Sequence, residues 1–166
     1  KLDCITSHID FFSRTENLED KVFAQDIIYV GGGNTKSMLA VWKEWNLHEI
    51  LQNAYEKGIV MSGVSAGAIC WFDKGITDSY AEELTIIDCL GIVGGIACPH
   101  FDEEKEREPY VNDVINREII KSCICIEGNC ALHVKNNIEY SSIDFGNGKK
   151  CFRVYKEKNT LKKEIL

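Results

Sequence analysis

One serine stands where a strand is expected to turn sharply into a helix. Ser65 is the centre of Gly63-Val64-Ser65-Ala66-Gly67, which follows the apolar run 59–61 and precedes a helix-like segment, 68–72. A G-x-S-x-G pattern between a buried strand and a helix is typical of a nucleophile elbow, in which glycines permit a strained turn that exposes the serine. The pattern therefore predicts a serine nucleophile, with an ordinary glycine-rich turn as the alternative.

A serine nucleophile needs a base, and the chain has four histidines. His100 follows the strand-like segment 92–98 and Pro99, so it falls at the carboxyl end of a strand, where the sites of α/β proteins gather. We predict that His100 is the base, against the alternative of a loop histidine with local hydrogen bonds. Of the other three, His8 lies in a poorly patterned region, His48 on the expected solvent side of a helix, and His133 in a late strand.

A carboxylate is expected to orient that histidine. Glu127 directly follows the apolar run 123–126, where a carboxylate is costly to bury without a partner. Asp102 is two residues from His100 and competes for the role. The pattern leaves Glu127 and Asp102 open, with a solvated loop carboxylate as the alternative for each. Two acidic residues earlier in the chain are further candidates: Glu83 and Asp88.

A second glycine-rich turn could stabilise negative charge. Gly31-Gly32-Gly33 ends the strand-like run 26–30 and precedes a helix that Asn34 can cap. Its backbone N–H groups, together with that of Ala66, could form an oxyanion hole. A phosphate cradle is the rival interpretation. The segment lacks the lysine and spacing of a P-loop, and G-x-G-x-x-G is absent.

The elements that would position these residues alternate along the chain. Apolar runs predict buried strands at 26–30, 59–61, 92–98 and 123–126. Helices are expected after Asn34, up to Gly58, and from Pro109 onward. The helix that ends at Gly58 is expected to bury an apolar stripe with helical spacing, made of Leu47, Ile50, Leu51, Ala54 and Tyr55. This alternation predicts a parallel α/β sheet. Antiparallel strands are expected to finish it at 131–134, 138–143 and 151–155. We also expect a short strand at 2–6, irregular structure at 73–90 and a helical or frayed tail at 157–166.

Composition narrows the class of protein. A chain of 166 residues predicts one domain, and its net charge of −7 disfavours binding to nucleic acid or to anionic membrane surfaces. No apolar stretch approaches the length of about 18 residues that a membrane span needs. The cysteines predict reduced thiols, a cytoplasmic setting and no metal site, because most lie in or beside apolar runs. These are Cys70, Cys89, Cys98, Cys123, Cys125 and Cys130.

Four blocks of the sequence together resemble one family. They are Tyr29-Val30-Gly31-Gly32-Gly33-Asn34-Thr35, Gly63-Val64-Ser65-Ala66-Gly67-Ala68, Pro99-His100-Phe101 and Glu127-Gly128-Asn129. In order and spacing these blocks resemble the peptidase E (aspartyl dipeptidase) and cyanophycinase family of serine peptidases. The order serine, histidine, acid also differs from the serine, acid, histidine order of α/β-hydrolases.

The resemblance implies a fold. We expect an α/β, three-layer parallel-sheet sandwich resembling the class I glutamine amidotransferases, with antiparallel strands near the C-terminus. Residues 1–166 would form a single peptidase E-like domain. Family members begin with further elements before the segment that matches residues 2–6, so the resemblance also predicts that the N-terminal strands of a full protein are absent from this sequence.

The resemblance also implies roles for particular residues. Ser65 falls on the nucleophile, His100 on the general base and Glu127 on the orienting acid. Gly32 and Ala66 match the oxyanion hole. Arg107 and Asn34 are expected to bind substrate, Arg107 by pairing with an acidic side chain, although a surface ion pair within the acidic run 103–108 remains its alternative.

The implied function is that of a dipeptidase-like serine exopeptidase. Its substrates would be small peptides, including those with an acidic first residue, and it would need no metal or organic cofactor. We expect a monomer or a homodimer. A β-aspartyl or cyanophycin-like isopeptide hydrolase and a non-catalytic binding relative are the alternatives. A thiol-dependent amidotransferase is disfavoured because the elbow holds serine and Cys70 lies five residues later.

Overall fold

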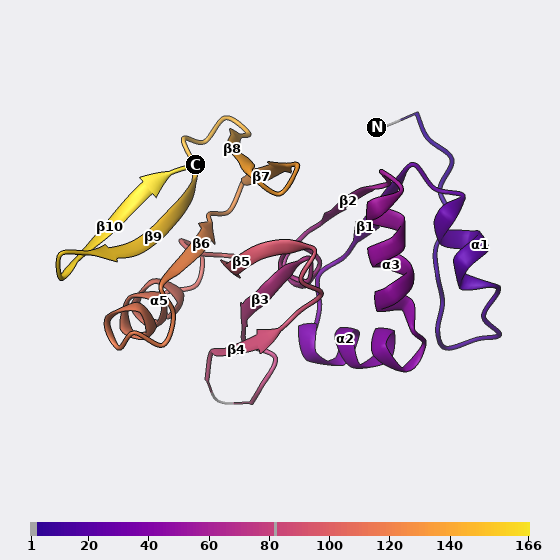
Figure 1. Ribbon diagram of the computed structural model, residues 1–166, viewed down its shortest axis with the longest axis horizontal. Helices are drawn as coiled ribbons and strands as arrows, with labels where there is room; N and C mark the ends of the chain where they lie inside the picture. The colour runs from indigo at the N-terminus through magenta and orange to yellow at the C-terminus, as the bar shows by residue number, and fades with distance from the viewer. Residues whose placement is uncertain (1–2, 82) are drawn as a thin grey trace.

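Two short parallel strands bring the two glycine-rich turns together. In the computed structural model, which describes residues 3–81 and 83–166, β1 (Ile27–Val30) pairs with β2 (Val60–Gly63) (Figure 1). The paired residues run from Ile27 with Val60 to Val30 with Gly63. Because the strands are parallel, both of their carboxyl ends lie at one edge. The Gly31-Gly32-Gly33 turn and the predicted elbow are therefore neighbours.

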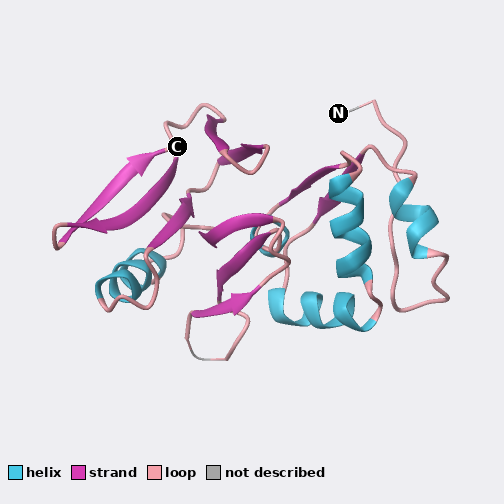
Figure 2. Cartoon of the chain, viewed as in Figure 1, coloured by secondary structure: helices cyan, strands magenta, loops and turns pink. Residues whose placement is uncertain are grey.

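Three helices pack beside these strands: α1 (Leu18–Phe23), α2 (Thr35–Glu44) and α3 (Leu47–Glu56) (Figure 2). Asn34 caps α2 as predicted, since its side-chain oxygen accepts a hydrogen bond from the Ser37 N–H at 2.9 Å. The predicted apolar stripe of α3 is buried, because residues spaced three and four apart share one helix face. Its buried members are Leu47, Ile50, Leu51 and Ala54.

The second half of the chain builds a six-stranded sheet in the order β10-β9-β6-β5-β3-β4. The pairs β3–β5 and β5–β6 are parallel, whereas β4, β9 and β10 pair antiparallel. The strands are β3 (Phe72–Thr77), β4 (Thr85–Asp88), β5 (Val93–Cys98), β6 (Ser122–Ile126), β9 (Cys151–Glu157) and β10 (Thr160–Ile165). The fold is thus mixed α/β with a mainly parallel centre and antiparallel strands toward the C-terminus.

Three further elements complete the described chain. They are the short helix α4 (Ala66–Ile69), the helix α5 (Arg107–Asn116) and the antiparallel hairpin of β7 (Cys130–Lys135) and β8 (Glu139–Asp144). α4 connects β2 to β3, and α5 connects β5 to β6 and packs against β9 (Figure 1). The C-terminal ends of β2, β5 and β6 therefore lead into the elbow, His100 and Glu127 respectively.

Two apolar clusters form the core. One joins α1–α3 to the start of β3 and to Val93 and Ala97 of β5, and contains Trp42, Trp71 and Phe72. The other lies between α5 and the strands β5, β6 and β9. Buried thiols contribute to both clusters as small apolar groups. They are Cys70 in the first cluster and Cys98, Cys123 and Cys125 in the second.

The structure corrects three local predictions. The expected strand at 2–6 is absent from its described part, since residues 3–6 are exposed coil, and Leu2 lies outside the described residues. Residues 73–90 contain most of β3 and all of β4; their strand signal is hidden because Asp73, Lys74 and Gly75 interrupt the apolar pattern. The tail forms β10, which turns back on β9 at Lys158 and Asn159, both in the left-handed region.

Crossing a bilayer would require a longer and more apolar helix than any in the part of the chain that the structure describes.

Candidate active site

Ser65 occupies a strained turn between β2 and α4. Its backbone angles are φ 56° and ψ −118°, a region that residues other than glycine rarely adopt. The side chain is half-buried rather than enclosed. Strain of this kind costs of the order of 1–3 kcal/mol and persists where the surrounding structure imposes it. The geometry is that of the predicted nucleophile elbow.

The two flanking glycines explain how the turn is imposed. A Cβ atom on Gly63 would lie within 3 Å of the carbonyl groups of Gly67 and Val30, and one on Gly67 within 3 Å of the carbonyl of Val30. Neither position has room for a side chain. The elbow therefore packs its backbone directly against the end of β1, as strand–helix contacts through glycine allow.

The Gly31-Gly32-Gly33 turn lies beside the serine. A Cβ atom on Gly32 would stand 3.3 Å from Ser65 Cβ and 3.7 Å from its Oγ. Ala66 is the first residue of α4, where backbone N–H groups have no acceptor within the helix. Gly32 and Ala66, the two residues expected to form an oxyanion hole, thus flank Ser65.

His100 begins a tight turn after β5. Its own φ is 53°, and its carbonyl accepts hydrogen bonds from the N–H groups of Glu103 and Glu104, both at 3.1 Å. The Phe101 N–H donates to the Ile126 carbonyl at 3.0 Å, which fastens the turn to the end of β6. The imidazole is partly exposed and lines the same cavity as Ser65.

The carboxylate that contacts His100 is Glu103. Its Oε2 lies 2.6 Å from His100 Nδ1, a short distance typical of a charge-assisted hydrogen bond. Sequence reasoning missed Glu103 because it stands at the head of the acidic run 103–108, and such a run is typical of a solvated surface loop. A signal was present in the spacing, since residues three apart in a turn lie side by side.

The two acids singled out from the sequence have other partners. Glu127 Oε2 accepts the Lys150 N–H at 2.9 Å, and Glu127 also lines the cavity. Asp102 accepts the Gly128 N–H at 2.8 Å and pairs with the Lys149 ammonium. Partial burial opposes ionisation of Asp102, but the hydrogen bonds from Lys149 and Gly128 outweigh it and lower the pKa of this carboxyl.

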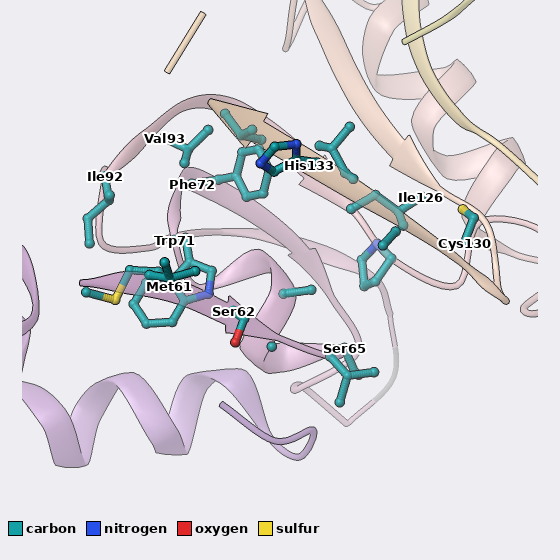
Figure 3. A pocket seen from close by; sticks show the side chains of 18 of the residues that line it. Met61, Ser62, Ser65, Trp71, Phe72, Ile92, Val93, Ile126, Cys130 and His133 are labelled. Carbon is teal, nitrogen blue, oxygen red and sulfur yellow. The ribbon is translucent and has the colours of Figure 1, made fainter. Parts of the chain in front are cut away.

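A cavity of about 840 Å³ lies between β2 and β7 (Figure 3). Ser65, His100, Glu103 and Glu127 all line it. Figure 3 shows Met61, Ser62 and Ser65 on one side and Ile126, Cys130 and His133 on the other. A small peptide fits a volume of this size. The remaining labelled residues are all apolar: Trp71, Phe72, Ile92 and Val93.

Arg107 and Asn34, the expected substrate-binding residues, are engaged within the fold. The Arg107 side chain is only 2% exposed, and its guanidinium donates to Glu104 at 2.6 Å and to the Ile76 carbonyl at 3.1 Å. Asn34 caps α2 and donates to the Ser79 carbonyl at 3.1 Å. The wall of the cavity around Ser65 is built from other residues.

Removing the Arg107 guanidinium is therefore expected to cost stability rather than substrate affinity. Arg107→Met should lower the free energy of unfolding by about 2–3 kcal/mol, because the buried Ile76 carbonyl and Glu104 lose a charged donor. Arg117→Met is the matched control, since Arg117 makes an exposed pair with Asp113 and should change stability little. Urea unfolding of both variants checks this. A raised KM for Asp-X dipeptides at unchanged stability would instead make Arg107 a substrate anchor.

Residues that could hold a metal ion are not gathered anywhere in 3–81 and 83–166: the structure there contains no group of three or more His, Cys, Asp or Glu side chains arranged for coordination.

Comparison with known proteins places the chain among peptidases. The family model "Peptidase family S51" matches residues 1–139. The chain is 42% identical over 154 residues to the protein named "Uncharacterized peptidase YgaJ" of Bacillus subtilis (strain 168), covering 92% of this chain and 66% of that protein. It is 29% identical over 108 residues to "Uncharacterized peptidase Lin0382" of Listeria innocua, covering 61% and 49% of the two.

A solved structure has the same fold. It is a crystal structure described as a "Putative Peptidase E Protein" from Listeria monocytogenes EGD-e, with a TM-score of 0.60 and 20% sequence identity. The match covers 78% of this chain and 64% of the other. The chain thus spans between about half and just under two thirds of the length of these relatives. With the family model matching most of its residues, the chain belongs to peptidase family S51.

Proposed function

We propose that this chain is a serine peptidase that hydrolyses small peptides, with Ser65 as the nucleophile and His100 as the general base. The observation that carries the proposal is the backbone of Ser65, held in a strained turn between β2 and α4 at the edge of a cavity that His100 also lines. Membership of a peptidase family supports it.

In this mechanism Ser65 Oγ attacks the peptide carbonyl carbon. His100 accepts the hydroxyl proton through Nε2, since Nδ1 faces Glu103. The oxyanion is held by the N–H groups of Gly32 and Ala66, which flank the serine. His100 then protonates the leaving amine as the C–N bond breaks, and water hydrolyses the acyl-enzyme by the same proton transfers in reverse order.

Small peptides are proposed as substrates because the cavity of about 840 Å³ is large enough for a few residues. An acidic first residue was expected on the strength of Arg107, whose guanidinium instead contacts Glu104 and Ile76. The mainly apolar wall, including Trp71 and Phe72, offers contacts to apolar side chains as well. We therefore assign peptides as a class, with no fixed first residue.

A fluorophosphonate probe tests the nucleophile directly. We expect the probe to label the wild-type protein on Ser65, located by mass spectrometry of the labelled peptide, and to leave Ser65→Ala unlabelled. Ser37→Ala is the matched control, because Ser37 lies on α2 away from the cavity, and it should be labelled at the wild-type rate. Equal labelling of wild type and Ser65→Ala would contradict the proposal.

A panel of Asp-X, Glu-X, Ala-X and Leu-X dipeptides identifies the substrate class. Turnover of any member that Ser65→Ala abolishes supports a peptidase. Labelling of Ser65 without turnover of any dipeptide would transfer the proposal to isopeptides, such as β-aspartyl bonds, with the same nucleophile. If Ser65 is not labelled and no dipeptide is hydrolysed, the result would favour a non-catalytic binding relative.

We also propose a reducing, cytoplasmic setting. Burial raises the pKa of the Cys98 thiol to about 12 and that of Cys70 further, so both stay protonated at neutral pH and pack as apolar groups.

We also propose that the fold resembles that of the class I glutamine amidotransferases. The serine elbow at the end of a parallel strand supports this likeness.

A further inference from the structure

We propose that Asp102 is a positioning residue that holds the His100 turn against the end of β6 and so sets the place of His100 relative to Glu127. Asp102 acts through these two residues and does not touch substrate. The inference rests on the proposed serine peptidase function, with Glu127 as the expected orienting acid. It gives Asp102, a competitor for that role on sequence alone, a different task.

The two strands that lead into this part of the site run side by side. β5 and β6 are parallel (Figure 1), and their register pairs Cys98 with Cys125. His100 lies two residues beyond Cys98, and Glu127 lies two residues beyond Cys125. Catalytic side chains keep a productive geometry when hydrogen bonds and packing hold the residues around them. The bonds beyond the strand ends therefore decide how the two side chains sit relative to each other.

Two hydrogen bonds join the His100 turn to the residues on either side of Glu127. The Phe101 N–H donates to the carbonyl of the residue before Glu127, Ile126, at 3.0 Å. Asp102 Oδ1 accepts the N–H of the residue after it, at position 128, at 2.8 Å. Glu127 is thus bracketed by contacts from the turn that carries the histidine.

The second oxygen of Asp102 holds a third segment. Oδ2 pairs with the Lys149 ammonium, and the next residue, Lys150, donates its N–H to Glu127 Oε2 at 2.9 Å. Consecutive residues of one segment therefore bind Asp102 and Glu127. The two carboxylates are tied to each other through this segment as well as through the end of β6.

The burial and charge of Asp102 suit this task. Its side chain is 21% exposed and that of Lys149 is 37% exposed, so water surrounds the pair only in part. Partial burial opposes ionisation, but the Lys149 ammonium and the Gly128 N–H outweigh it and lower the pKa of the Asp102 carboxyl. The carboxylate is therefore ionised at neutral pH, and its hydrogen bond from Gly128 is a charge-assisted one.

The bonds of Asp102 differ from those of an orienting acid, which contacts the imidazole itself. Its two oxygens are engaged with Gly128 and Lys149. An orienting acid depends on its negative charge, whereas the positioning role depends mainly on an oxygen that accepts the Gly128 N–H. Asparagine keeps such an oxygen and loses the charge, so it separates the two roles.

Three variants of the full chain test the contact step by step. We expect Asp102→Ala, which removes both bonds, to lower the maximal rate constant of fluorophosphonate labelling of Ser65 by about 10²-fold, the cost of misplacing a catalytic group by about 1 Å. Asp102→Asn keeps the acceptor for Gly128, and Lys149→Met keeps the carboxylate. Each should lose less than about tenfold, because a partly exposed ion pair contributes little. The probe concentration that gives half the maximal rate should stay nearly unchanged, since Asp102 does not bind the probe.

The matched control is Asp113→Asn. Asp113 forms an exposed ion pair with Arg117 on α5, away from the residues that line the cavity, so this variant should be labelled at the wild-type rate. Urea unfolding checks that each variant is folded under the labelling conditions. We expect folding to persist, because Phe101 stays buried in the second apolar cluster and anchors the turn.

The Gly128 amide reports the contact independently of rate. In the wild-type protein and in Asp102→Asn, its N–H should exchange slowly with solvent in NMR experiments, because a side-chain oxygen accepts it. In Asp102→Ala the exchange should be at least about tenfold faster, as for a locally opened segment. A role limited to overall stability would instead speed the exchange of the slowest core amides together with that of Gly128.

The outcomes are distinct. Slow labelling in Asp102→Ala with nearly normal labelling in Asp102→Asn and Lys149→Met supports the inference. Equally slow labelling in Asp102→Asn and Asp102→Ala overturns it, because the charge would then matter as it does for an orienting acid. Wild-type labelling in Asp102→Ala also overturns it and leaves the serine peptidase intact.

Two further results are also decisive. If Asp102→Ala does not fold, the other two variants decide: retention of the rate in both supports the inference, and a large loss in Asp102→Asn alone overturns it. Absence of Ser65 labelling in the wild-type protein overturns the proposed function and, with it, this role for Asp102.

Discussion

Replacing Ser65 with glycine is expected to make the protein more stable and inactive at once. The backbone of Ser65, at φ 56° and ψ −118°, costs a side-chain-bearing residue about 1–3 kcal/mol, and glycine is largely spared that cost. The greater conformational freedom of glycine in the unfolded chain lowers the free energy of unfolding by about 0.5–1 kcal/mol. We therefore expect a net rise of about 1 kcal/mol in the free energy of unfolding, measured by urea titration. On the proposed function, activity should fall by about 10⁴- to 10⁶-fold, the range for removing a triad residue from a serine protease.

Ser65→Ala separates the two effects. Alanine removes the hydroxyl but keeps Cβ, so it should lose the same activity without gaining stability. Equal unfolding free energies for the glycine and alanine variants would mean that the strain at Ser65 is only about 0.5–1 kcal/mol, enough to offset the greater freedom of glycine in the unfolded chain. A glycine variant less stable than alanine by that amount would show that the turn stores no strain at Ser65. A higher free energy of unfolding for the glycine variant than for the alanine variant, as expected, would mean that the conformation exposing the Ser65 hydroxyl destabilises the fold.

Much of the fold could be predicted because its strands are short apolar runs that end at glycine or at polar residues. β1, β2, β5 and β6 were expected at nearly their observed bounds, and the α3 stripe at its observed spacing. β3 was not predicted because its exposed Asp73 and Lys74 break the apolar run, as does Gly75, where a Cβ atom would clash with the side chain of Ile69. β10 was not predicted because its residues are mostly exposed, include charged side chains and carry no apolar alternation. They form a strand because they pair with β9.

The site was predictable where local sequence determines geometry. The elbow depends on Gly63 and Gly67, whose need for close approach is written into the G-x-S-x-G pattern. The partner of His100 was not predictable from strand ends alone, because it depends on a turn that folds Glu103 back onto the ring. Glu127 lines the cavity with His100, as its place at the end of β6 predicts, and its role as the orienting acid stays a prediction. The structure adds hydrogen bonds that the sequence does not reveal, from the Lys150 N–H to Glu127 and from the Lys149 ammonium to Asp102.

Gly67→Ala is expected to unsettle the elbow itself. Its Cβ would fall within 3 Å of the carbonyl groups of Val30 and Gly31, and backbone atoms of this kind cannot rotate away as a side chain can. Either β1 or α4 must shift, so we expect the free energy of unfolding to fall by about 3 kcal/mol, as for severe overpacking. Because Ser65 lies two residues from the clash, its probe labelling should fall at least a hundredfold in the fraction that remains folded.

Gly31→Ala is the matched control for stability, since a Cβ atom there would meet nothing within 4 Å. It should unfold within about 1 kcal/mol of the wild-type protein, with any gain coming from a less flexible unfolded chain. If Gly67→Ala proved as stable as Gly31→Ala and kept its labelling, α4 would not be packed against the end of β1. The conformation of Ser65 would then depend on the residues of the turn alone and not on the contact between Gly67 and β1. Loss of stability and labelling together would tie the reactive conformation of Ser65 to the glycine contact with β1.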